Sequence, residues 1–178
     1  RPFIKTVLLI TLIAGTLDII AAMIHVTVNT GRFPNRIFQA IASGMVGRDM
    51  AFAGGLATHA LGFIVHYFIA FSFTVFYFLV YPYVTMLGKN KWVSGVVYGW
   101  FIWVVMNLVV LPYFSFIPRR PFDWPNDVVG LVILPLVVGV PIAVGAERYY
   151  SGLLAASHKK TSPRNVLASL RTKATKKP

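Results

Sequence analysis

The chain contains no cysteine. Disulfide bonds, thiolate metal sites, iron–sulfur clusters and thiol nucleophiles are therefore excluded within its 178 residues. The short motifs of several enzyme classes are missing too: we find no nucleophile elbow, Walker loop, dinucleotide fingerprint or zinc-protease helix. These absences favour a non-enzymatic protein, although they leave other kinds of enzyme open.

Charged residues are scarce, and acidic residues are the scarcest. Only 12% of the residues are charged, against about 25% in a soluble domain. Because 57% are hydrophobic and the mean hydropathy is +0.70, we expect an integral membrane protein. Five acidic residues stand against seventeen Lys and Arg, a net charge of +12. These cations flank apolar segments, so we assign them to membrane orientation and anionic lipid, not to nucleic acid.

Four apolar stretches are long enough, or nearly so, to cross a bilayer, which takes about 20 helical residues. They cover residues 6–28, 54–84, 92–113 and 128–146. Between the first two, a proline followed by apolar residues at helical spacing predicts a short interfacial helix. We therefore predict an all-α polytopic membrane protein whose four transmembrane helices form a bundle over residues 1–147.

Basic residues are distributed unequally over the two sides of the predicted bundle. Twelve Lys and Arg fall on the side of the termini and five on the other, which predicts cytoplasmic termini. Residues 148–178 are expected to form a mobile basic tail. Lys159 and Lys160 in this tail, with Arg119 and Arg120 before the fourth stretch, are candidates for contacting anionic headgroups. The alternative for all four is a solvated position.

Two pairs of ionisable residues interrupt the first two apolar stretches. Asp18 and His25 lie seven residues apart, as do His59 and His66, so each pair shares one helix face. In antiparallel spans Asp18 would lie level with His66 near mid-membrane. His25 would then lie level with His59, about 10 Å further outward. Asn107 of the third stretch falls between these levels, and we call the five residues the polar ladder.

Three interpretations of the polar ladder compete. In the first, the polar atoms hold the helices together, with Asp18 accepting a hydrogen bond from His66. In the second, the residues form a relay for protons or ions. In the third, His25, His59 and His66 ligate a metal or haem b. Since no haem attachment motif is present, we predict no cofactor and keep haem b as the alternative.

Small residues at four-residue spacing occur twice in the apolar regions. Gly95 and Gly99 form one such pair, and Ala51 and Gly55 form the other. Pairs of this kind let two helix backbones approach closely. We expect them to serve packing within the chain more than association between copies.

Local features between the second and fourth stretches match those of a known family. The sequence Leu61-Gly62-Phe63-Ile64-Val65-His66 precedes an aromatic-rich segment, Gly95 and Gly99 follow Trp92, and Leu111-Pro112 leads into the prolines of 118–125. In these features the chain resembles the YagU-like family of uncharacterised bacterial inner-membrane proteins. The resemblance implies a helical bundle in the bacterial inner membrane. It implies no activity, and His66 is the one ladder residue that it covers.

The sequence favours a non-enzymatic accessory or scaffolding subunit that packs against a larger membrane complex. The parts outside the apolar stretches are too small for a catalytic domain, and the apolar residues exceed what a small bundle can bury. One alternative is a small proton or ion channel or transporter that uses Asp18 and His66. A second is a membrane redox protein that binds haem or a metal. The expected partners are the bilayer, other membrane subunits and anionic lipid.

Overall fold

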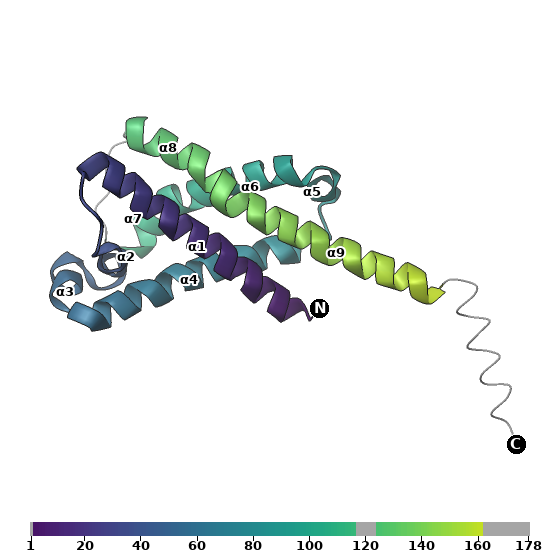
Figure 1. Cartoon of the computed structure of the whole chain (residues 1–178), viewed down its shortest axis with the longest axis horizontal. Helices are drawn as coiled ribbons and strands as arrows, with labels where there is room; N and C mark the ends of the chain where they lie inside the picture. The colour runs from purple at the N-terminus through teal and green to yellow at the C-terminus, as the bar shows by residue number, and fades with distance from the viewer. Residues whose placement is uncertain (1, 117–123, 162–178) are drawn as a thin grey trace, which may run out of the picture.

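The computed structural model describes residues 2–116 and 124–161, and these residues form helices joined by short links (Figure 1). Four helical segments have the length and apolar composition of membrane spans. The predicted all-α fold with four transmembrane helices is thereby confirmed. The spans are α1 (Phe3–Thr30), α4 (Gly55–Val80), the continuous run of α6 (Lys91–Val105), η1 (Met106–Val110) and α7 (Leu111–Phe114), and the run of α8 (Trp124–Leu134), η2 (Pro135–Gly139) and α9 (Val140–Thr161).

Short helices occupy two of the links. α2 (Ile37–Val46) and α3 (Arg48–Ala53) connect α1 to α4, so the link predicted to hold one helix holds two. Gly47 separates them with a φ of 80°, a conformation that side-chain-bearing residues rarely adopt. α5 (Thr85–Lys89) lies between α4 and α6.

Two helix ends differ from the predicted ranges. α4 ends at Val80, before the predicted end of its apolar stretch at residue 84, because Pro82 has no backbone N–H to donate to a further helical hydrogen bond. α9 continues beyond residue 147 to Thr161, through a segment rich in Leu and Ala, which favour helix. The segment predicted as a tail therefore begins as helix, and residues 162–178 lie outside the described residues.

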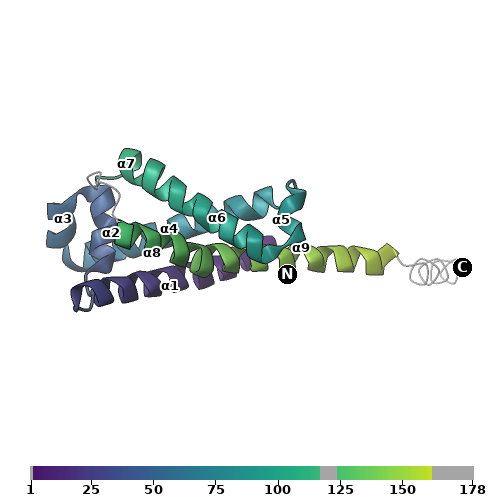
Figure 2. The same ribbon diagram turned by 90° about the horizontal axis from the view of Figure 1, so that it is seen from above.

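The two ends of the bundle differ in what they carry (Figures 1 and 2). The N-terminus, α5 and the start of α6 lie toward one end, which we call the terminal end. α2, α3, α7 and the start of α8 lie at the other, which we call the α2 end. The last part of α9 extends past the terminal end of the bundle.

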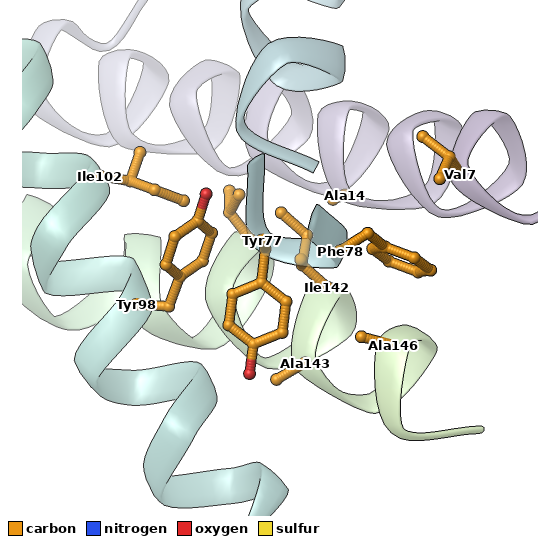
Figure 3. Close-up of a cluster of buried hydrophobic side chains, with 10 residues drawn as sticks. Val7, Ala14, Tyr77, Phe78, Tyr98, Ile102, Ile142, Ala143 and Ala146 are labelled. Atoms are coloured by element: carbon orange, nitrogen blue, oxygen red, sulfur yellow. The ribbon is translucent and has the colours of Figure 1, made fainter. Parts of the chain in front are cut away.

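A cluster of buried side chains packs the terminal half of the bundle (Figure 3). The Tyr98 hydroxyl donates to the Phe73 carbonyl at 2.6 Å, so the polar tip of this buried ring is paired. We call this cluster the aromatic core. Its members are Val7, Ala14, Tyr77, Phe78, Tyr98, Ile102, Val138, Ile142, Ala143 and Ala146.

The predicted small-residue pairs lie in different surroundings. On Gly99 a Cβ would come within 2.2 Å of the Pro135 Cα, and on Gly95 within 2.6 Å of the Val140 Cα. The structure thus places this pair in a close contact between α6 and the η2–α9 segment. Gly54 interrupts the helix between the buried Ala51 and Gly55, which opens α4 with a φ of 56°, so those two residues share no helix.

Candidate functional site

A cavity of about 540 Å³ occupies the half of the bundle toward the α2 end. Its walls come from the middle of α1 and α4, from α2, from the stretch between α6 and α7, and from α8 and η2. Most of the side chains that face it are aliphatic or aromatic. An apolar cavity of this size with a few convergent polar groups is typical of a site for a small molecule.

Three residues of the polar ladder line this cavity. Asp18 comes from α1, His66 from α4 and Asn107 from η1. Each interrupts an apolar span, and burying such groups in a membrane is costly. The structure therefore brings Asp18, His66 and Asn107 together around one cavity.

Hydrogen bonds within the cavity wall occupy only some of the donors and acceptors of these three residues. His66 Nε2 lies 2.8 Å from the carbonyl oxygen of Gly15, and because a carbonyl only accepts, Nε2 carries the hydrogen. A side chain on residue 15 would press on Tyr67, 3.0 Å from the ideal Cβ position. Asn107 Nδ2 donates to the Trp103 carbonyl at 3.0 Å.

Asp18 makes no hydrogen bond or ion pair with another residue in the described part of the chain, although it interacts electrostatically with His66. A direct Asp18–His66 hydrogen bond was the central contact of the interpretation in which the ladder holds helices together. His66 instead joins α4 to α1 through the Gly15 backbone. The carboxylate of Asp18 is thus left facing the cavity.

The other two ladder residues have partners elsewhere. His25 Nε2 lies 3.0 Å from Asn29 Nδ2, one turn further along α1. The ring nitrogens of His59 each lie 3.1 Å from a carbonyl oxygen, those of Gly55 and Asn35. Neither residue lines the cavity.

A metal or haem site needs several ligands around one space. Within the described ranges no group of three or more His, Asp or Glu residues is placed to hold a metal ion. His66 is the only one of the three proposed haem ligands in the cavity wall. Haem b binding stays the alternative to the prediction of no cofactor, and the arrangement of these histidines does not strengthen it.

Both π-helical segments contribute to the cavity wall, η1 through Asn107 and η2 through Val138. Such segments are rare and often occur at functional sites. Pro135 opens η2 and has no N–H to donate. The carbonyl of Leu131, one turn earlier, instead accepts a hydrogen bond from the Trp100 indole at 3.0 Å, which joins α6 to α8.

α2 forms the wall at the α2 end because it is fixed to α4. A Cβ on Gly62 would come within 1.8 Å of the Phe38 carbonyl oxygen, so only glycine permits this approach. The buried Gln39 lies with its amide nitrogen 3.3 Å from both the Gly55 carbonyl and the Thr58 hydroxyl. The sequence analysis did not predict the roles of Gln39 and Gly62. The one signal for Gln39 is that it is a polar residue within an otherwise apolar helix.

The aromatic core borders the cavity on its terminal side. On α1, α4 and α6 the aromatic core occupies the turns next to the cavity on the terminal side, and Ile102 and Val138 belong to both. At the α2 end the wall includes Met45, 52% exposed, and Phe114, 73% exposed. Phe116, which follows α7, donates its backbone N–H to the Gly44 carbonyl of α2 at 2.9 Å, so α2 and the chain after α7 are joined at this end.

The four residues predicted to contact lipid headgroups cannot be placed relative to the cavity. Arg119 and Arg120 lie outside the described residues, and the side chains of Lys159 and Lys160 do as well.

Comparison with protein-family models, curated proteins and solved structures gives no match. The functional argument therefore starts from the cavity.

Proposed function

We propose that this membrane protein is a non-enzymatic binding protein that takes a small amphipathic molecule into its cavity. One observation carries the proposal: Asp18 lines an apolar cavity of about 540 Å³, and its carboxylate has no hydrogen-bonding partner among the described residues. An acid inside a membrane span is costly and marks a functional site by default. If it only joined helices, we would expect a protein donor beside it.

The shape of the cavity bears on the proton or ion hypothesis, which uses the same Asp18 and His66. A channel needs a continuous path, whereas a carrier exposes a central site to one side at a time. The aromatic core fills the terminal half beside the cavity. Of the two, a carrier is therefore the better supported, and binding is its first step.

Photolabelling tests the proposed binding site. The protein is placed in lipid nanodiscs with a diazirine-bearing long-chain alcohol, and labelled peptides are located by mass spectrometry. We expect labels on the cavity-facing residues of α1, α4 and η1. In Ala22→Phe, which fills the cavity from α1, most of this labelling should be lost.

Ala60→Phe is the matched control, because Ala60 is exposed on α4 and does not line the cavity. It should keep the labelling of the unaltered protein. Equal labelling of the two variants, or labels spread evenly over lipid-facing residues, would contradict binding in the cavity.

We further propose that the protein serves as an accessory subunit, and the projecting part of α9 supports this role. Leu153 is 47% and Leu154 63% exposed, on a helix that extends past the bundle (Figure 2). Exposed leucines there have no apolar surface of the described residues to pack against, and another subunit would supply one.

Site-specific crosslinking tests the accessory role. A photoreactive amino acid at position 154 should crosslink one defined protein in native membranes. At position 12, an exposed leucine within the α1 span, it should give lipid adducts. If position 154 gives no discrete protein adduct, the accessory role is rejected.

We also propose a membrane and an orientation for the protein. The asymmetry of basic residues supports cytoplasmic termini, and the resemblance to the YagU-like family supports a bacterial inner membrane. In this orientation the α2 end, and the cavity with it, would lie toward the outer side of the membrane.

A further inference from the structure

The polar groups of the cavity differ in what they still offer once their internal hydrogen bonds are counted. His66 uses its Nε2 hydrogen on Gly15, so the neutral ring offers only the lone pair of Nδ1. Asn107 uses one amide hydrogen on the Trp103 carbonyl, and it keeps its second amide hydrogen as a donor and its amide oxygen as an acceptor. Asp18, when ionised, offers two accepting oxygens. The three ladder residues in the wall thus offer mainly acceptors.

The charged residues of the cavity wall also favour a ligand that donates hydrogen bonds. Asp18 is the only acid that lines the cavity, and no Lys or Arg lines it among the described residues. An ionised carboxylate in apolar surroundings is costly unless a positive charge compensates it. His66 interacts electrostatically with Asp18, but its hydrogen bond goes to Gly15. The described residues of the wall thus supply no Lys or Arg to Asp18, and a bound cation would supply the positive charge.

We propose that the bound molecule is an amphipathic cation with a protonated amine as its head. This inference rests on the proposed function and names its ligand class. The ammonium group donates to the Asp18 carboxylate, with His66 Nδ1 and Asn107 Oδ1 as further acceptors. The apolar body lies along α2, toward the exposed Met45 and Phe114. Trp103 also lines the cavity, and indole rings attract cations.

Three probes with the same chain and different heads test the ligand class. Dodecylammonium, dodecanol and dodecanoate compete with the photoreactive alcohol for the protein in nanodiscs of zwitterionic lipid. We expect dodecylammonium to compete about tenfold better than dodecanol, the size of one charge-assisted hydrogen bond. Dodecanoate should be the weakest competitor, because Asp18 repels it.

Variants assign this preference to Asp18. In Asp18→Asn the ratio of ammonium to alcohol affinity should fall close to one, whereas Asp18→Glu should retain a preference for the ammonium. Asp49→Asn is the control, since Asp49 is exposed on α3 and lies outside the cavity wall. It should leave the ratio unchanged. Circular dichroism and size-exclusion chromatography establish that each variant folds.

The outcomes separate this inference from the proposed function. If the alcohol labels the cavity but the three probes compete equally, or dodecanoate competes best, the cationic ligand is ruled out while the binding site stands. If the alcohol does not label the cavity at all, the proposed function fails and the ligand class fails with it. A preference for ammonium that persists in Asp18→Asn also overturns the inference.

Discussion

Buried hydroxyl groups in the bundle differ in whether they find a partner. Thr16 and Tyr67 share a hydrogen bond of 2.9 Å between α1 and α4, and Thr74 donates to the Ala70 carbonyl at 2.8 Å. The Thr11 hydroxyl has no partner among the described residues, although it is buried. A buried polar group without a hydrogen bond lowers stability. Unlike Asp18, Thr11 does not line the cavity.

Replacing Thr11 with valine should therefore stabilise the protein. The substitution keeps the shape of the side chain and removes the unpaired hydroxyl, so we expect a gain of about 1 kcal/mol in the free energy of unfolding. Thermal unfolding in detergent measures it. Thr74→Val removes a hydroxyl that is paired and should give no gain. A loss of stability in Thr11→Val would mean that the hydroxyl is bonded after all.

At this scale the sequence indicated depth but not partners. Asp18 and His66 were predicted at one level from their positions in two spans, and both line one cavity. The partner of His66 could not be foreseen, because it depends on the backbone of Gly15 beside Tyr67. His59 likewise lies near a carbonyl of the α1–α2 link, whose path no periodicity describes.

Contacts between helices rely on glycine at points where backbones meet. Gly99 on α6 lies against Pro135, and Gly62 on α4 lies against the Phe38 carbonyl of α2. The first contact fixes the π-helical segment η2, and the second fixes the wall at the α2 end. Spacing in the sequence indicated the first. The second has a small residue at the same spacing, Thr58, whose hydroxyl lies 3.3 Å from the Gln39 amide nitrogen of α2, but we did not predict this contact from the sequence.

Gly99→Ala should destabilise the bundle. Its Cβ would lie 2.2 Å from the Pro135 Cα, so the two backbones must separate, at a cost of about 1–3 kcal/mol. Gly152→Ala is the matched control, because nothing lies within 4 Å of its Cβ position and alanine favours helix. It should raise the unfolding temperature, or leave it unchanged. Equal effects of the two variants would contradict the close contact.

Gly62→Ala should act on the cavity. A Cβ there overlaps the Phe38 carbonyl, so α2 must move away from α4. We expect weaker photolabelling by the long-chain alcohol, since α2 forms one wall of the cavity. The helical content, measured by circular dichroism, should change little because α1, α4 and α6 remain. Unchanged labelling would show that α2 is not needed for binding.

The molecule as a whole is divided into a packed half and a hollow half. The aromatic core fills the terminal end, and the cavity occupies the α2 end. The four spans could be predicted because a bilayer requires long apolar helices, which composition alone reveals. The division into a packed half and a hollow half could not be predicted, since it depends on which side chains meet between helices.

The absence of cysteine gives a direct test of orientation. Single cysteines at Met50 on α3 and at Ser157 on α9 lie at opposite ends of the bundle (Figure 1). In intact cells, a membrane-impermeant maleimide should label Met50→Cys and leave Ser157→Cys unlabelled until the cells are permeabilised. The reverse pattern would place the α2 end of the bundle on the cytoplasmic side.

The projecting helix α9 has a mechanical consequence. It continues η2, whose Val138 lines the cavity, as one helix of 22 residues from Val140 to Thr161. Ile142, Ala143 and Ala146 of this helix are buried in the aromatic core, and the Tyr150 hydroxyl donates to the Phe78 carbonyl, so its first half is held by the bundle. Only the residues beyond Tyr150 project, over about 16 Å at 1.5 Å per residue. The direction of this projecting end is therefore set by the packing of the terminal half of the bundle.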